Sequence, residues 1–211
     1  ITGEEKMHEK LELFRGRHID GHAPGLTGPD LQAYRLSGVE NDHECTAYSE
    51  VIEKLRAGFT ILMREGSGAK NVEILLTALM EECLPLDSCL FCTDDKHLAE
   101  IVADGHISTC VRKAIALGVP VAKAYKMASY NAARYYGLSG LGAIGAGYQA
   151  DLLLLDDIAD PRPTDVMVNG RFLTEADYAA DLSVPEPEEL IHTVDIPPLT
   201  PADIALPYGG E

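Results

Sequence analysis

The amino-acid sequence predicts an α/β fold built on a parallel sheet. Three observations lead to this class. Short segments with strand character alternate with segments of helical periodicity through the first hundred residues, and polar residues follow four of the strands. From about residue 138, glycine-rich turns and β-branched or leucine runs replace this alternation. Strands separated by helices must run parallel, so the first part forms either a doubly wound sheet or a (β/α)8 barrel.

The first two predicted βα units each have a strand that ends in a histidine. Residues 17–22 form the first strand, which ends at His22, and the helix that follows has Pro29 at its first position. The second strand covers residues 38–43 and ends at His43.

The helix after the second strand is expected to have Thr46 as its N-cap. Its apolar residues at roughly helical spacing are Val51, Ile52, Leu55 and Phe59. Phe59 opens the third strand instead if that strand covers residues 59–64. A clearer amphipathic helix follows the loop 65–68, with apolar residues at i, i+3, i+4, i+7 and i+8: Val72, Leu75, Leu76, Leu79 and Met80.

The fourth predicted strand, residues 89–93, runs into Asp94 and Asp95, and helices are expected at 107–117 and 120–136. In both parallel-sheet architectures, functional residues collect at the carboxyl ends of the strands. Here those ends carry His22, His43, Arg64–Glu65 and Asp94. Successive strand residues face opposite sides, so one of the two aspartates points into the site, and we favour Asp94.

The sequence changes character in its last third. Apolar runs at 151–155 and 165–171 predict strands, and Asn169–Gly170 between apolar residues predicts a hairpin turn. Beyond residue 181, prolines among acidic residues predict an extended connector. The expected organisation is therefore a sheet domain at 1–137, a small β domain at 138–180 and a connector at 181–211.

The composition disfavours nucleic acids and membranes as partners and favours a reducing compartment. A formal net charge of -17 disfavours a nucleic-acid partner, because phosphate backbones would be repelled. The sequence contains no apolar run of the ~20 residues that a membrane-spanning helix needs, so no membrane is expected. Five cysteines suit a reducing compartment better than a disulfide framework, and we expect a cytoplasmic protein.

The strand-end residues are suitable for metal chemistry. His22, His43 and Asp94 offer imidazole and carboxylate ligands for a divalent metal ion, which lowers the pKa of a bound water. The alternative, that these residues only satisfy loop or core positions, stays open at this stage. Cys89 and Cys92 are expected to be buried thiols rather than metal ligands, because an odd separation on a strand turns them to opposite faces.

Four stretches resemble, in order, the barrel motifs of the bacterial adenine deaminase family, which belongs to the metal-dependent amidohydrolases. They are HIDGHAPGL at 18–26, SGVENDHECT at 37–46, MREGS at 63–67 and FCTDDKH at 91–97. Two later stretches, MASYNAAR at 127–134 and GAIGAGYQAD at 142–151, resemble the region where an amidohydrolase barrel joins its small β domain.

The resemblance implies a partial (β/α)8 TIM-like barrel, about the last four βα units, with a small β-sandwich segment. It implies that His22 and His43 are metal ligands on the fifth and sixth strands, and that Asp94 on the eighth is both ligand and proton shuttle. The implied cofactor is a divalent metal, manganese or iron with zinc as the alternative, binuclear in the complete enzyme.

The resemblance also implies the reaction. Adenine and water give hypoxanthine and ammonia through attack of a metal-activated hydroxide at C6, and Asp94 transfers the proton. Glu65 is assigned to catalysis beside Asp94. The residues expected to contact the substrate are Arg64, Ser67, Glu44 and His97. For Glu44 and His97, a place in a solvated loop is an open alternative.

Two departures from the family pattern stand out. The chain lacks the His-x-His of the first strand and the acid of the fourth, and Ala132 stands where many relatives have proline. We therefore expect the chain alone to be inactive. Its expected partner is the missing N-terminal half of the polypeptide or a complementing chain. We also expect the protein to form a homo-oligomer. The alternatives are another cyclic amidohydrolase, such as a hydantoinase-like enzyme, and a non-catalytic structural module.

Overall fold

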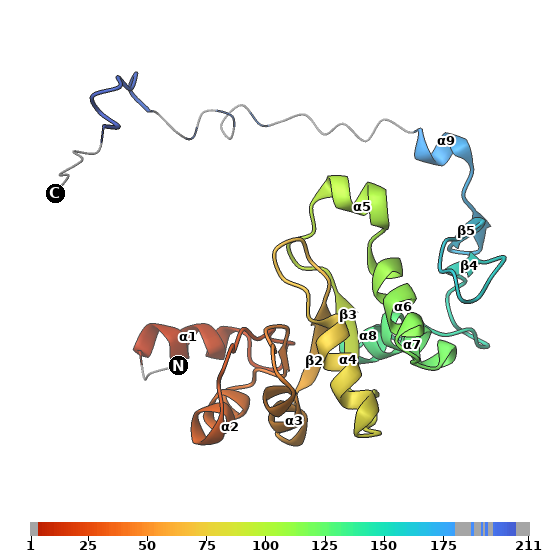
Figure 1. Cartoon of the computed structure of the whole chain (residues 1–211), viewed down its shortest axis with the longest axis horizontal. Helices are drawn as coiled ribbons and strands as arrows, with labels where there is room; N and C mark the ends of the chain where they lie inside the picture. The colour runs from red at the N-terminus through yellow and green to blue at the C-terminus, as the bar shows by residue number, and fades with distance from the viewer. Residues whose placement is uncertain (1–3, 180–186, 188–190, 192, 194–195, 206–211) are drawn as a thin grey trace. The chain divides into compact units, whose positions relative to one another are not determined.

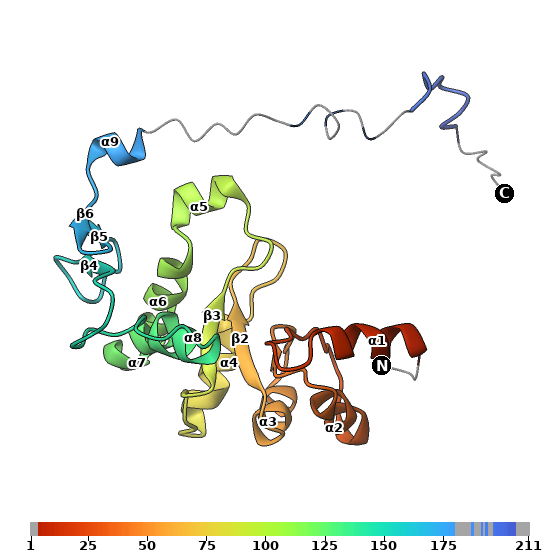
Figure 2. The same cartoon turned by 180° about the vertical axis from the view of Figure 1, so that it is seen from behind.

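The structure is a computed structural model. It describes residues 4–179, 187, 191, 193 and 196–205. The chain divides into two compact units, residues 1–173 and 174–211. The first unit contains the two sheets of the described chain (Figures 1 and 2). Among the described residues, no helix combines the length and the apolar character needed to cross a membrane.

Three parallel strands form the first sheet: β1 (Asn41–Asp42), β2 (Thr60–Arg64) and β3 (Cys89–Cys92), in the order β1-β2-β3. Asp42 lies opposite Ile61, and Ile61 lies opposite Cys89, so these three side chains share one face of the sheet. The predicted parallel pairing of these strands is confirmed. A helix separates each pair of consecutive strands, as the βα alternation requires.

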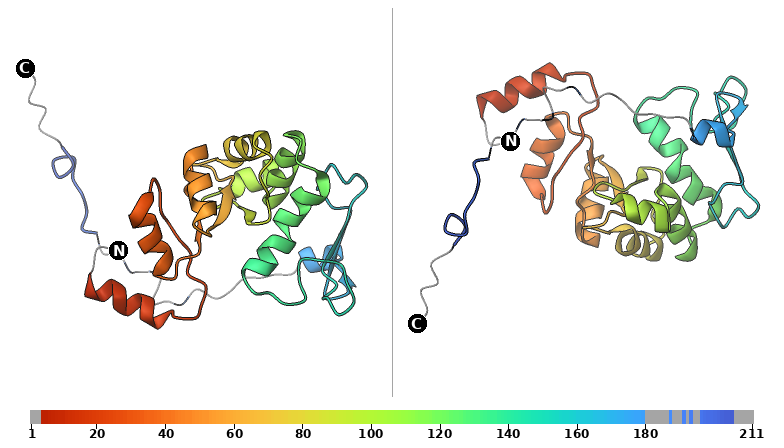
Figure 3. Two further views of the ribbon diagram at one scale, coloured as in Figure 1. Left: turned by 90° about the horizontal axis from the view of Figure 1, so that it is seen from below. Right: turned by 90° about the horizontal axis from the view of Figure 1, so that it is seen from above.

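Eight helices belong to the described part of the first unit: α1 (Glu5–Leu13), α2 (Gly28–Leu36), α3 (Tyr48–Arg56), α4 (Val72–Glu81), α5 (Leu98–Asp104), α6 (Ile107–Ala116), α7 (Val121–Ala128) and α8 (Tyr130–Tyr135). The predicted apolar stripe of α4 is confirmed, because Val72, Leu75, Leu76 and Leu79 are fully buried. They pack in one core with residues of β2, β3, α3, α6 and α7. These helices therefore cover one face of the sheet (Figure 3).

The prediction of a strand at residues 17–22 was wrong. The segment has no regular structure, and the Glu40 N–H, just before β1, donates to the Ile19 carbonyl at 3.4 Å. The Gly21 N–H donates to the side chain of Asn41 at 2.7 Å, where a ladder would require a backbone carbonyl. A Cβ on Gly21 would lie 2.0 Å from the Asn41 carbonyl oxygen, so only glycine permits this close approach.

Two features of the helices also differ from prediction. The N-cap of α3 is Ala47 rather than Thr46. Phe59, whose place in this helix or at the start of the next strand was left open, lies beyond the helix end, immediately before β2. The single helix expected at 120–136 is two helices, α7 and α8, because Ser129 leaves the helical region with φ −131° and ψ −76°.

An antiparallel sheet follows: β4 (Leu152–Leu154), β5 (Asp165–Val168) and β6 (Arg171–Phe172). The predicted hairpin is present, since Asn169 and Gly170 join β5 to β6 with φ of 50° and 78°. In the second unit, α9 (Glu175–Tyr178) begins with a capping box between Thr174 and Asp177. Most of the connector predicted at 181–211 lies outside the described residues.

Candidate metal and active site

Two histidines and a glutamate meet at the carboxyl end of the parallel sheet. The rings of His22 and His43 are 5.4 Å apart between centroids. The Oε1 atom of Glu44 lies 3.4 Å from Nδ1 of His22 and 3.2 Å from Nε2 of His43. One ligand atom of each residue lies within 4.8 Å of the others, which suits a shared metal ion. We refer to His22, His43 and Glu44 as the ligand cluster.

Arg64, at the end of β2, joins the ligand cluster to Asp94. Its Nη1 and Nη2 atoms donate to the two carboxylate oxygens of Glu44 at 2.7 and 3.1 Å, and Nη1 also donates to Asp94. Asp94 Oδ2 lies 3.9 Å from His43 Nε2. Burial lowers the pKa of Arg64, but the hydrogen bonds to Asp94 and Glu44 outweigh it and raise that pKa. The guanidinium therefore remains charged between two carboxylates.

The choice between Asp94 and Asp95 is visible in the geometry. Asp94 follows the end of β3 in a left-handed conformation, with φ of 52°, and its side chain contacts Arg64 and His43. Asp95 instead accepts a hydrogen bond from the Gly68 N–H at 3.0 Å. The structure thus places Asp94, the aspartate favoured from the sequence, beside the ligand cluster.

Glu65 points elsewhere. Its side chain is buried and accepts a hydrogen bond from Lys113 of α6 at 2.8 Å, while its second oxygen has no partner among the described residues. Arg64 and Glu65 are consecutive, so their side chains face opposite sides of the sheet. The structure therefore places Glu65 among the covering helices, apart from Arg64 and Asp94.

Ser67 and His97 form a second polar contact near the same edge of the sheet. The Ser67 hydroxyl accepts a hydrogen bond from the His97 N–H at 2.9 Å and donates to Glu100 at 2.6 Å. These contacts tie the loop after β2 to the start of α5. The structure pairs Ser67 with His97 and Glu100, and these contacts do not involve the ligand cluster.

A buried ion network, which the sequence analysis missed, underlies the ligand cluster. Lys54 of α3 is fully buried, and its ammonium donates to the carboxylates of Asp42 and Glu50 at 2.8 and 2.7 Å. It also donates to the Ala23 carbonyl at 2.7 Å. Lysine is rarely buried, so a sequence pattern favours a solvated side chain here. The one available signal was its place between the apolar Val51 and Leu55 of the same helix.

Asn71 was missed as well. Its side chain accepts a hydrogen bond from the Arg64 N–H at 2.6 Å and donates to the carbonyls of His43 and Cys45 at 3.2 and 3.0 Å. Asn71 precedes α4, so it links the start of that helix to the end of β2 and to the loop after β1. These contacts hold the backbones of Arg64 and His43 in place.

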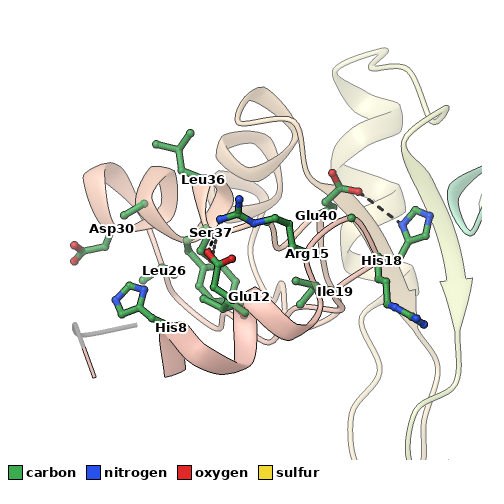
Figure 4. Close-up of a pocket in the computed structure, with 16 residues that line it drawn as sticks. His8, Glu12, Arg15, His18, Ile19, Leu26, Asp30, Leu36, Ser37 and Glu40 are labelled. Carbon is green, nitrogen blue, oxygen red and sulfur yellow. Dashed lines mark hydrogen bonds and ion pairs between the residues drawn. The ribbon is translucent and has the colours of Figure 1, made fainter. Parts of the chain in front are cut away.

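A groove lies away from the ligand cluster. Side chains of α1 and α2 line it, among them His8, Glu12, Asp30 and Leu36, together with the segment 15–19 (Figure 4). His18 and Glu40 form an ion pair at its rim, 3.7 Å between Nδ1 and Oε2. None of the sequence-predicted site residues lines this groove.

The parallel sheet and the candidate ligands at its carboxyl end are typical of metal-dependent hydrolases, and comparison with known proteins identifies the class. The chain belongs to the amidohydrolase family, whose profile matches residues 1–173. Its fold is therefore of the barrel-like type that this superfamily shares. The crystal structure of a β-aspartyl dipeptidase from Fervidobacterium islandicum agrees, with a TM-score of 0.51 at 20% identity over 65% of this chain and 40% of that chain.

Two relatives with higher sequence identity to this chain are both named adenine deaminase. The chain is 44% identical over 98% of its length to an adenine deaminase of Desulfitobacterium hafniense, and 38% identical over 99% of its length to an adenine deaminase of Petrotoga mobilis. It spans 36% and 37% of these two relatives. The chain thus covers little more than a third of the proteins that it resembles.

Proposed function

We propose that this chain is the C-terminal part of the barrel of an adenine deaminase and supplies part of its metal site. The single observation that carries the proposal is the convergence of His22, His43 and Glu44, with Asp94 beside them, at the carboxyl end of a parallel sheet. The names of the relatives support the substrate, adenine. The remaining strands of the barrel are proposed to come from the N-terminal half of the polypeptide or from a complementing chain.

The donor set fits a divalent metal. His22 and His43 supply neutral imidazole nitrogens, and Glu44 and Asp94 supply carboxylate oxygens, a combination that manganese, iron and zinc all accept. We propose manganese or iron, with zinc as the alternative, and a binuclear centre in the complete enzyme. Glu44 enters this set from the geometry, because its oxygen lies between the two imidazoles.

Asp94 and Arg64 have separate roles in the proposed reaction: Asp94 transfers a proton, and Arg64 orients Asp94. A divalent metal supplies a nucleophile at neutral pH by lowering the pKa of a water molecule. Asp94 would accept a proton from this water as the water oxygen bonds to C6 of adenine, and would deliver that proton to the amino group at C6. The C6–N bond then breaks, and ammonia and hypoxanthine leave. Because Arg64 donates to Asp94, it holds this carboxylate in position before the proton moves.

Ser67 and His97 are proposed to shape the substrate side of the site. They fix the loop after β2 against the turn that carries Asp94. For Glu65, the contact with Lys113 favours a role in holding α6 against the sheet, and its proposed catalytic role requires the side chain to leave that contact.

A fusion experiment tests the proposal. The 211-residue chain is expressed alone and also fused behind the N-terminal segment of the Desulfitobacterium hafniense relative, and conversion of adenine to hypoxanthine is followed with manganese or iron present. We expect turnover by the fusion and none by the chain alone. The matched variants are His43→Ala, which should abolish turnover, and His8→Ala, which should not.

Three results would count against the proposal. Turnover by the isolated chain would contradict the partial site. Hydrolysis of a hydantoin in place of adenine by the fusion would indicate another cyclic amidohydrolase. A folded fusion that is active on neither compound would indicate a non-catalytic module.

A further inference from the structure

The ammonium of Lys54 contacts both loops that carry the ligand-cluster histidines. The Ala23 carbonyl, one of its acceptors, directly follows His22. The Asp42 carboxylate, its second acceptor, directly precedes His43. The third acceptor is Glu50, one turn earlier on the same helix.

The carboxylates of Asp42 and Glu50 also accept hydrogen bonds from backbone N–H groups of both loops. Asp42 accepts hydrogen bonds from the N–H groups of Ala23 and Glu44 at 2.8 and 3.1 Å. Glu50 accepts from the N–H groups of Gly25 and Thr46 at 2.8 and 3.0 Å. Each carboxylate therefore touches the loop after His22 and the loop after His43.

Every donor of the Lys54 ammonium has an acceptor, and the network is buried. An ammonium has three donors, and all three of Lys54 are used. Its side chain and that of Asp42 are fully buried, and that of Glu50 is 8% exposed, so water does not compete for these contacts. A buried lysine without solvent is costly unless every donor is satisfied. Here the geometry satisfies them.

We propose that Lys54 is a positioning residue that sets the distance and angle between His22 and His43, and thereby the metal affinity of the ligand cluster. The inference rests on the proposed metal site. Outer contacts of this kind orient metal ligands, and their loss typically weakens metal binding by roughly 10–100-fold. A merely structural role would change the stability of the chain and leave the affinity of the folded fraction unchanged.

The test uses cobalt(II) as the probe and the full 211-residue chain. Cobalt(II) is titrated into the unsubstituted chain and three variants, and the visible d–d absorption reports the affinity and the ligand geometry. Lys54→Met removes the ammonium at similar length, and Lys126→Met is the matched control because Lys126 forms an exposed pair with Asp87. His22→Ala shows whether the signal belongs to the ligand cluster. Thermal unfolding by circular dichroism gives the folded fraction of each sample.

We expect Lys54→Met to bind cobalt(II) at least tenfold more weakly than the unsubstituted chain, with an altered absorption band, and Lys126→Met to match the unsubstituted chain. Equal affinity and an equal spectrum in folded Lys54→Met would overturn the positioning role while leaving the proposed metal site intact. Absence of cobalt(II) binding by the unsubstituted chain would overturn the positioning role, because the chain would have no affinity for Lys54 to set. Cobalt(II) binding that survives His22→Ala would overturn both the positioning role and the proposed metal site.

If Lys54→Met does not fold, Glu50→Gln decides the question. This variant keeps the shape of the side chain and the Lys54–Asp42 pair. It turns an amide donor toward the N–H of Gly25 or Thr46, which loosens one loop. A tenfold loss of cobalt(II) affinity would support the inference, and an unchanged affinity would overturn it.

Discussion

Arg64 donates to both carboxylate oxygens of Glu44, at 2.7 and 3.1 Å, in a bidentate pair. The same guanidinium also donates to Asp94. Glu44 follows β1, Arg64 ends β2 and Asp94 follows β3, so one cation links the ends of three neighbouring strands. A bidentate pair fixes the orientation of both groups, so Arg64 holds the Glu44 carboxylate beside the two imidazoles.

Glu44→Gln should weaken cobalt(II) binding by about tenfold or more, because an amide oxygen is a poorer ligand than a carboxylate and the pair with Arg64 is lost. Titration of the 211-residue chain by visible absorption measures this. Glu40→Gln is the control, since Glu40 pairs with His18 and Arg35 outside the ligand cluster. Equal affinity in both variants would show that Glu44 is not a ligand.

Asn71→Ala should lower the free energy of unfolding by about 2–4 kcal/mol, because three backbone groups, two of them buried and one partly buried, lose their partner at once. Urea unfolding followed by circular dichroism measures the change. The exposed Gln149→Ala should change the same quantity by less than about 0.5 kcal/mol. A loss for Asn71→Ala no larger than that of the control would contradict the bracing role.

The Lys54 network should make stability depend on pH in the acid range. Burial raises the pKa of Asp42 and of Glu50, but hydrogen bonds from Lys54 and from backbone N–H groups outweigh it and lower both below their ordinary values of 3.8 and 4.5. A carboxyl with a lowered folded pKa contributes stability that is complete above its ordinary pKa and is lost as the pH falls through the folded value.

We therefore expect the unfolding free energy to decline as the pH falls below about 4.5, and to decline less in Glu50→Gln than in the unsubstituted chain. Urea titrations at pH 7 and pH 3 give the difference. The exposed Glu73→Gln should retain the unsubstituted pH dependence. The same pH dependence in Glu50→Gln as in the control would contradict the account.

The cysteines should differ sharply in reactivity. Cys83 is exposed, whereas burial raises the pKa of Cys89, Cys92 and Cys110 to about 12 and raises that of Cys45 as well. At pH 8 only about one in ten thousand of a thiol with pKa 12 is thiolate, the reactive form. Iodoacetamide and mass spectrometry should show one rapid modification in the native chain and five after denaturation.

Cys83→Ser is the control for that experiment and should remove the rapid modification. Rapid native labelling of a second cysteine would show that the core opens more readily than its packing implies.

Local patterns in the sequence predicted much of the fold. The stripe of α4 depends only on helical spacing, and the hairpin at Asn169–Gly170 depends on two adjacent residues that tolerate positive φ. The polar residues at strand ends were predictable for the same reason, because parallel strands bring their carboxyl ends to one edge. Each of these predictions needs only residues near one another in the chain.

The features that were missed depend on contacts between distant residues. The segment 17–22 is not a strand because Asn41 takes the Gly21 N–H through its side chain, twenty residues away. The sequence predicts that Lys54 is a solvated helix residue. In the fold, Asp42 and the Ala23 carbonyl lie beside its ammonium and accept its hydrogen bonds. No local periodicity encodes such partners, so only coordinates reveal them.

In the proposed site, His22, His43, Glu44 and Asp94 surround one metal position. Anomalous X-ray diffraction from crystals of the chain grown with manganese tests it most directly. We predict an anomalous peak within about 2.0–2.3 Å of a ring nitrogen of both His22 and His43, with a carboxylate oxygen of Glu44 or Asp94 as a further ligand. A fully loaded crystal whose manganese peaks all lie away from both histidines would contradict the claim.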